Sequence, residues 1–152
     1  MKTRYEETQR FHPLLSGLLF AMLIIIPILA ILDANAADST QLMQFVSLPE
    51  IFLIFIWVNF LEMKIIVTDE FAQFGFGLFR KKIPLKKIVS CKPFEVRFGQ
   101  YFGIGIRFNW WNRTILFNTR FGKAVRIKVR GSRRDYVVTT DNQKKLCQVL
   151  RK

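Results

Sequence analysis

The stretch Val125 to Arg130, VRIKVR, alternates an apolar with a cationic residue at every step. Successive side chains of a β-strand point to opposite faces, so this alternation predicts a strand with one face buried and one in water. The same period recurs at 74–78, 94–98 and 104–108, and glycine-containing turns separate the segments. From residue 64 onward, the spacing predicts about seven antiparallel strands.

The last expected strand lies near Asp135 to Thr139. It is followed by Thr140-Asp141-Asn142-Gln143, which has the polar spacing of a helix capping box. We therefore expect a helix that runs to about Leu150, with Leu146 and Val149 in its apolar stripe.

Charge divides the chain into two parts. Residues 1–62 carry a net charge of −3 and residues 63–152 a net charge of +16, which together give the +13 of the whole chain. A strongly basic part of this size indicates an anionic partner, either nucleic acid or an anionic lipid surface.

The first apolar segment, Leu14 to Leu32, holds no charged residue. As a helix it is about 28 Å long, close to the ~30 Å of a bilayer core, and it predicts a transmembrane helix despite Pro27. A buried core helix is one alternative. A signal peptide is another, because Ala34-Asn35-Ala36 resembles a cleavage site.

A second apolar segment, Ile51 to Leu61, is short by itself and reaches a membrane-spanning length only if it is extended to about 45–62. Ser47 to Glu50 fits a capping box, with Ser47 as the N-cap. Glu50 is then a capping residue near the interface, and the alternative is a functional acid inside the membrane.

The distribution of cations predicts the orientation. Lys and Arg flank the two apolar segments and are absent between Asp33 and Thr40, and positive flanks face the cytoplasm. We therefore expect a multi-pass protein of the cell (inner) membrane with both termini cytoplasmic. Its parts are a leader (1–13), a helical hairpin with spans at about 14–32 and 45–62 within 14–62, and a cytoplasmic β-domain (63–152).

The basic part also resembles a known family. The segments Tyr101 to Arg107, Gly122 to Ile127 and Tyr136 to Asp141, followed by Leu146, look like those of small membrane-anchored bacterial proteins with a pleckstrin-homology-like domain. This resemblance implies a membrane-anchored all-β fold: a seven-stranded barrel, capped by a C-terminal helix, after a transmembrane hairpin. It implies no enzyme activity.

The sequence lacks the residues of a recognisable catalytic or metal site. His12 is the single histidine, and Cys91 and Cys147 are far apart and have no metal-binding spacing. We interpret the two cysteines as buried, reduced thiols. We expect no enzyme, no metal and no cofactor.

The stretch Arg107 to Phe117 places Trp110 and Trp111 between two expected strands, with Arg107 and Arg113 on either side. Three interpretations stay open: the turn folds back over the core, it lies at the level of lipid headgroups, or it stacks against single-stranded nucleic acid. Tryptophan and arginine together favour headgroups, and we do not expect nucleic acid.

The cations of VRIKVR form a second candidate site. Arg126, Lys128 and Arg130 are expected on one exposed strand face, and Arg134 follows the next turn. The face is either simply solvated or in contact with anionic headgroups. The partners that we expect are membrane lipids or a membrane-protein partner, and a homo-oligomer stays open.

We therefore predict a non-enzymatic integral membrane protein whose basic domain binds anionic lipid or a protein partner at the cytoplasmic face of the membrane. The lipid- or partner-binding residues are predicted to be Trp110, Trp111, Arg113, Arg126, Lys128, Arg130 and Arg134. The alternative is a scaffolding or regulatory subunit of a larger membrane complex that uses its transmembrane hairpin, with Phe52, Phe55, Trp57 and Asn59, as the interface.

Overall fold

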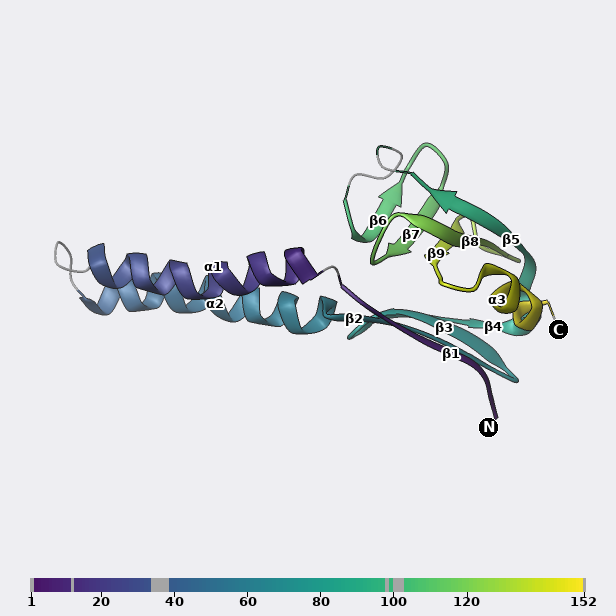
Figure 1. Ribbon diagram of the computed structural model, residues 1–152, viewed down its shortest axis with the longest axis horizontal. Coiled ribbons are helices and arrows are strands. Elements are labelled where there is room, and N and C mark those ends of the chain that lie inside the picture. Colours follow the sequence, from purple (N-terminus) through teal and green to yellow (C-terminus); the bar gives the residue numbers. More distant parts are fainter. Residues whose placement is uncertain (1, 12, 34–38, 98, 100–102, 152) are drawn as a thin grey trace.

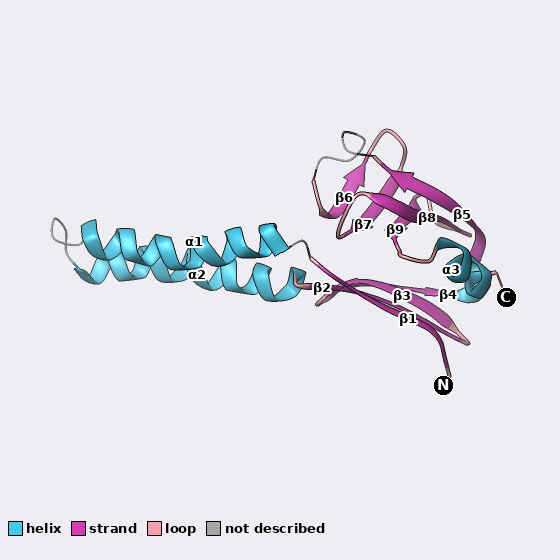
Figure 2. Cartoon of the chain, viewed as in Figure 1, coloured by secondary structure: helices cyan, strands magenta, loops and turns pink. Residues whose placement is uncertain are grey.

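The computed structural model describes residues 2–11, 13–33, 39–97, 99 and 103–151. Two long helices lie side by side at one end of the molecule, and two β-sheets with a short third helix form the other end (Figures 1 and 2). The helices are α1 (Pro13–Asp33), α2 (Ser39–Phe60) and α3 (Gln143–Leu150), with a 3-10 turn at Leu85–Lys87. The strands are β1 (Thr3–Arg10), β2 (Glu62–Thr68), β3 (Phe71–Phe76), β4 (Phe79–Pro84), β5 (Ile88–Val96), β6 (Gly105–Asn109), β7 (Thr114–Asn118), β8 (Gly122–Val129) and β9 (Asp135–Thr139).

The first sheet has the order β1-β2-β3-β4, and every pair in it is antiparallel. Its central strand β2 shows the expected period of two, because Met63, Ile65 and Val67 are almost completely buried while Lys64 and Ile66 are half-buried. One face of this sheet is therefore part of the core.

The second sheet has the order β5-β8-β9-β7-β6. All of its pairs are antiparallel except β7 with β9, which are parallel and place Thr114 opposite Asp135. In β8, Val125 and Ile127 are buried and Lys128 is exposed, as the alternation predicts.

The main core lies where the two sheets meet. Phe74 of β3 packs edge-on against Phe117 of β7 and Tyr136 of β9, at ring-centroid distances of 5.3 and 5.9 Å. These T-shaped contacts join the two sheets through their aromatic side chains. Helix α3 covers β5 and β8 with Leu146 and Leu150, so the predicted C-terminal helix and its apolar stripe are confirmed.

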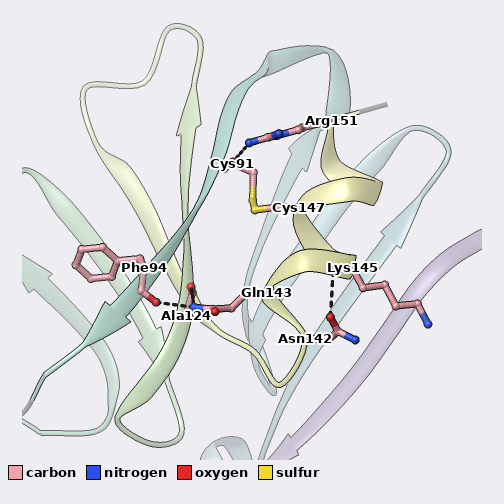
Figure 3. Close-up of a disulfide and its surroundings, with 8 residues drawn as sticks. All are labelled: Cys91, Phe94, Ala124, Asn142, Gln143, Lys145, Cys147 and Arg151. Atoms are coloured by element: carbon pink, nitrogen blue, oxygen red, sulfur yellow. Dashed lines mark hydrogen bonds between the residues drawn. A yellow bond between two sulfur atoms is a disulfide. The ribbon is translucent and has the colours of Figure 1, made fainter.

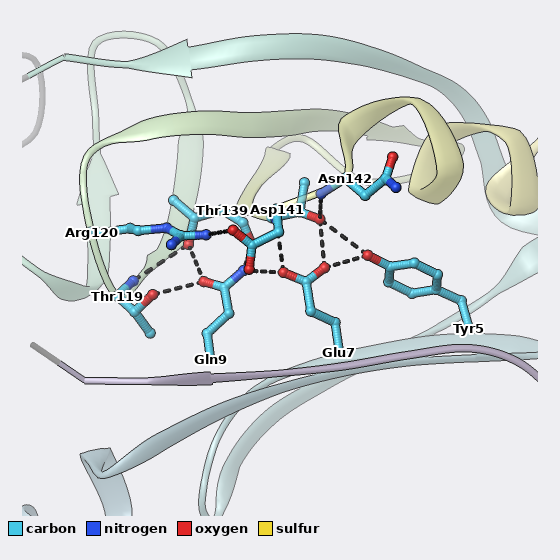
Figure 4. Close-up of polar contacts among 9 residues, drawn as sticks. Tyr5, Glu7, Gln9, Thr119, Arg120, Thr139, Asp141 and Asn142 are labelled. Carbon is cyan, nitrogen blue, oxygen red and sulfur yellow. Dashed lines mark hydrogen bonds and ion pairs between the residues drawn. The ribbon is translucent and has the colours of Figure 1, made fainter.

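Strand β1 lies in the segment 1–13, which was predicted to be a leader and not a strand. It pairs with β2 and is itself an edge strand of the first sheet. Its inward-facing side chains are Tyr5 and Gln9, which are buried, and Glu7, which is half-buried. They form a polar network with residues at and just beyond the ends of β7 and β9 (Figure 4). Gln9, only 5% exposed, donates to the Thr139 main-chain oxygen at 2.9 Å and accepts from the Thr119 hydroxyl at 2.7 Å.

Cys91 of β5 and Cys147 of α3 form a disulfide, with their Cα atoms 5.3 Å apart (Figure 3). The expectation of two reduced thiols is wrong, although both side chains are buried as expected. The sequence separation of 56 residues gave no local signal, because the pairing depends on how α3 docks against β5. Two hydrogen bonds near the disulfide also join the C-terminal helix region to β5. Arg151 donates to the Cys91 main-chain oxygen at 3.0 Å, and the Gln143 side chain donates to the Phe94 main-chain oxygen at 2.8 Å.

The expected transmembrane hairpin is contradicted. Among the residues that the structure describes, no helix is long and apolar enough to cross a membrane. The predictions of transmembrane helices, of a membrane protein and of a multi-pass inner-membrane location with cytoplasmic termini are corrected accordingly.

The predicted start of the second helix is also wrong. Helix α2 begins at Ser39, so Ser47 lies inside it, and Pro49 is an interior residue of the helix. Glu50 therefore does not belong to an N-terminal cap.

The predicted fold class, a membrane-anchored all-β barrel of seven strands, is wrong as well. Over its described residues the chain forms two separate sheets of four and five strands and three helices, a mixed fold of helices and strands. The strand count differs because the leader adds β1, and because the sharp turns at Gly77 and around Leu85 divide the region from 62 to 96 into four strands.

Candidate functional site

The turn between β6 and β7 is built by local side-chain hydrogen bonds. The Asn112 main-chain N–H donates to the Asn109 side-chain oxygen at 3.1 Å, and the Thr114 hydroxyl donates to the Asn112 main-chain oxygen at 2.9 Å. Arg113 completes the turn with a φ of 46°, which is the left-handed region that non-glycine residues rarely adopt. This geometry leaves Trp110 and Trp111 77% and 96% exposed.

Beside this turn lies a cavity of about 350 Å³. It is lined by Phe108, Asn109, Trp110, Arg113, Thr114, Arg133 and Arg134. Three guanidinium groups and two large aromatic side chains therefore share one small concave surface, which we call the Trp–Arg site.

Arg134 lies close to both aromatic side chains. Its guanidinium carbon is 5.1 Å from the ring centroid of Trp110 and 5.7 Å from that of Phe108, within the range of cation–π attraction. The Ser132 hydroxyl donates to the Arg134 main-chain oxygen at 2.8 Å and supports the turn that carries the arginine.

The parallel pairing of β7 with β9 brings Arg134 to this place. The Asp135 main-chain N–H donates to the Arg113 oxygen at 3.0 Å, so the turn before β9 lies directly against the turn before β7. Residues about twenty positions apart are thus held together by backbone hydrogen bonds.

The structure brings three of the predicted binding residues together in the Trp–Arg site: Trp110, Arg113 and Arg134. Trp111 is adjacent in sequence but does not line the cavity. The alternative that the two tryptophans fold back over the core is wrong, because both are exposed. Arg107 lies elsewhere, beside Gly103, where a Cβ atom would meet its guanidinium at 2.6 Å.

The other predicted residues, Arg126, Lys128 and Arg130, are separate from this cavity. Arg126 is paired with Asp135 at 2.8 Å, so its charge is partly compensated. Lys128 is exposed, and Arg130 lies just beyond the end of β8, where its main-chain N–H donates to the Lys87 oxygen at 2.7 Å. Because Asp135 contacts Arg126 through its carboxylate and Arg113 through its backbone, it lies between the two groups of cations.

Sequence reasoning missed Phe108 and Arg133 as residues of the site. Phe108 was expected to be a buried strand residue because it alternates with Arg107, yet it is 55% exposed. Arg133 stands beside Arg134 in the sequence, and this pair of adjacent arginines was the signal that could have included it.

No group of three or more His, Cys, Asp or Glu side chains in the described part of the chain could hold a metal ion. Comparisons with protein-family models, curated proteins and solved structures find no match for this chain. The resemblance to proteins with a pleckstrin-homology-like domain therefore stays a prediction.

Proposed function

We propose that the chain is a non-enzymatic binding module whose Trp–Arg site binds the headgroups of anionic lipids at a membrane surface. The observation that carries the proposal is the placement of the Arg134 guanidinium over Trp110, with Arg113 and Arg133 lining the same cavity. The wall of this cavity is cationic and aromatic at once.

The chemistry of these side chains suits such a surface. A guanidinium donates paired N–H groups that match the oxygens of a phosphate, and stacking on a ring holds it in position before binding. Tryptophan is favoured at the interface between lipid and water, because its ring is amphipathic. The exposed rings of Trp110 and Trp111 are costly in water alone and would gain from burial among headgroups.

The net charge of +13 supports the same proposal, because a cationic protein is attracted to an anionic surface before specific contacts form. Lipids are favoured over nucleic acid because the two tryptophans sit at the tip of a turn. A stacking platform for single strands needs rings along a groove that follows the backbone.

A vesicle sedimentation assay with the full chain tests this function. The variant Arg113→Gln/Arg133→Gln/Arg134→Gln removes three cations from the site, and Lys86→Gln/Lys123→Gln/Lys144→Gln removes three exposed cations elsewhere. Each cation near an anionic surface contributes about 1 kcal/mol, so we expect the site variant to bind anionic vesicles about a hundredfold more weakly. The control variant should lose much less, and neutral vesicles should bind neither protein.

If the site variant bound anionic vesicles as tightly as the parent chain, the Trp–Arg site would not be the lipid-binding site. Equal losses in both variants would show that only net charge matters. A Trp110→Ala/Trp111→Ala variant measures the aromatic contribution to vesicle binding. We expect this variant to bind more weakly than the parent chain at low and at high salt, because salt screens charges and not aromatic contacts.

A second candidate function is an interface with another protein, because the helical hairpin exposes large apolar side chains. Phe52 and Phe55 are 62% and 43% exposed, whereas Asn59 is only 7% exposed and is engaged within the chain. An apolar helix of a partner protein would bury such a surface. Substitution of both phenylalanines by serine should then abolish a co-purifying partner and leave vesicle binding unchanged.

A further inference from the structure

A cavity of about 750 Å³ lies where the helical hairpin meets the first sheet. Its walls come from the first turns of α1, the last turns of α2, the ends of β1 and β2 and the residues around the β3–β4 turn, and Figure 1 shows these elements converging. The described residues that line it are all different from those of the Trp–Arg site. Its volume is within the range of small-molecule sites.

The helical end of the cavity is apolar and aromatic. Phe20 and Trp57 line it with ring centroids 5.8 Å apart, and the Trp57 indole N–H donates to the Ser16 hydroxyl at 3.2 Å. Because the polar atom of Trp57 already has a partner, the ring offers an apolar surface to a ligand. A Cβ atom on Gly17 would meet no other atom within 4 Å, so α1 leaves open space at this point of the wall.

The sheet end of the same cavity is cationic. Among the described residues that line it, Arg10, Lys64 and Arg80 are cationic and Glu62 supplies the one carboxylate. Glu62 is 3.8 Å from Arg10 and 3.9 Å from Lys64, so one carboxylate is shared loosely between two cations. Such long, partly exposed pairs contribute little to stability, and they leave an excess of two positive charges to attract an anion.

From this arrangement we propose that the cavity binds a long-chain fatty acid. The carboxylate would lie among Arg10, Lys64 and Arg80, and the alkyl chain would lie against Phe20 and Trp57. A neutral apolar ligand would leave the excess of two positive charges uncompensated. A small anion without a chain would leave the aromatic end exposed to water.

Quenching of Trp57 by a fatty acid that carries bromine atoms tests this site. The full chain with Trp110→Phe and Trp111→Phe retains Trp57 as its one tryptophan, so the signal reports on this cavity alone. We expect saturable quenching by bromine-labelled stearate and at least tenfold weaker quenching by the corresponding brominated alcohol. An Arg10→Gln/Arg80→Gln variant should bind the acid about tenfold more weakly, because hydrogen bonds to charged groups are lost.

Two substitutions of one glycine give a steric test. Gly17→Leu fills the open space, and Gly17→Ala adds a single carbon atom at the same place. Alanine and leucine both have a higher helix propensity than glycine, so neither substitution is expected to prevent folding. Gly17→Leu should abolish saturable quenching, and Gly17→Ala should retain it.

Quenching that does not saturate, that is equal for the acid and the alcohol, or that survives Gly17→Leu would overturn the proposal. Vesicle binding is measured on a chain that keeps Trp110 and Trp111, and the Trp–Arg site contains none of the described residues that line this cavity. A failure here would therefore leave the proposed function standing, and a failure of vesicle binding would leave this cavity unaffected.

Discussion

The carboxylate of Glu7 accepts a hydrogen bond from the main-chain N–H of Asp141, 2.8 Å away and 134 positions along the chain (Figure 4). The same carboxylate accepts from the hydroxyl groups of Thr140, at 2.6 Å, and of Tyr5. Because β1 is hydrogen-bonded to β2, Glu7 connects the first sheet to the segment between β9 and α3. A carboxylate with several donors is among the stronger contacts that a folded chain makes.

Replacement of Glu7 should therefore destabilise the whole fold. We expect Glu7→Ala to lower the free energy of unfolding by about 3 kcal/mol, because the hydroxyl groups of Tyr5 and Thr140, both buried residues, lose their acceptor. Glu7→Gln keeps one oxygen and should cost about 1 kcal/mol. The control is Glu6→Gln, which removes the same charge from an exposed neighbour and should change stability by less than about 0.5 kcal/mol. Urea unfolding measures all three, and a loss in Glu6→Gln equal to that in Glu7→Gln would assign the effect to net charge.

Tyr5 gives the network a dependence on alkaline pH. Burial, together with its hydrogen bond to Glu7, raises the pKa of the Tyr5 hydroxyl from 10.0 to about 12. Since the folded pKa is the higher one, the stabilisation is fully present below about pH 10 and is lost as pH rises toward 12. Tyr5→Phe lacks the ionisable group. We expect the parent chain to be more stable than Tyr5→Phe near neutral pH and to lose this advantage between pH 10 and 12. A difference that stays constant over this range would contradict the assignment.

The disulfide predicts a response to reductant. In the chain-entropy account, closing a loop between positions 56 apart stabilises the fold by about 4 kcal/mol, and measured values are usually about 2–4 kcal/mol. Reduction should therefore lower the melting temperature of the parent chain. The double variant Cys91→Ala/Cys147→Ala should start from the lower temperature and be insensitive to reductant. If reductant left the parent chain unchanged, the two cysteines would not be linked in solution.

Local pattern predicted the strands whose buried face is apolar, and it failed for β1. The alternation of Val125 and Ile127 with cationic residues predicts β8, because a period of two in hydrophobicity indicates a strand with one buried face. In β1 the alternation is present, but its inward-facing members Tyr5, Glu7 and Gln9 are mostly polar, because they bond to hydroxyl groups just beyond the ends of β7 and β9. A strand whose inward-facing side chains are polar shows no alternation of hydrophobic residues in the sequence.

The candidate site was predictable only where it is continuous in sequence. Trp110 and Arg113 stand in one short stretch, and their exposure follows from the turn between two strands. Arg134 joins them through the parallel pairing of Thr114 with Asp135, and no local spacing specifies which strands pair in parallel. The same limit applies to Arg126, whose partner Asp135 is set by that sheet order.

The β3–β4 turn couples the end of α2 to the first sheet through Asn59 and Gly77. The Asn59 side-chain oxygen accepts from the Leu78 N–H at 3.0 Å, and Gly77 has a φ of 38°. A Cβ atom on Gly77 would lie 2.8 Å from the Asn59 main-chain oxygen and 2.5 Å from its side-chain oxygen. Gly77→Ala therefore combines steric overlap with left-handed strain, and we expect it to cost more than about 2 kcal/mol.

Gly131→Ala is the matched control for Gly77→Ala. Gly131 also has a positive φ, 77°, but an added Cβ atom meets nothing within 4 Å. It should cost only the strain, about 1 kcal/mol, in the same unfolding experiment. Equal losses at the two positions would mean that the contact with Asn59 contributes nothing.

Two substitutions of Arg113 distinguish its effect on lipid binding from its effect on the stability of the fold. Its left-handed φ of 46° is strained for a residue with a side chain, by about 1 kcal/mol or more, whereas glycine adopts it freely. Arg113→Gly and Arg113→Gln both remove the guanidinium, so both should weaken binding to anionic vesicles, each by about fivefold to tenfold. Only Arg113→Gly relieves the strain, and after the entropy cost of glycine it should be more stable than Arg113→Gln by up to about 1 kcal/mol. Vesicle sedimentation and urea unfolding on the same pair of proteins measure the two effects. If binding followed stability, so that Arg113→Gly retained affinity and Arg113→Gln lost it, Arg113 would act through the shape of the turn and not through its charge.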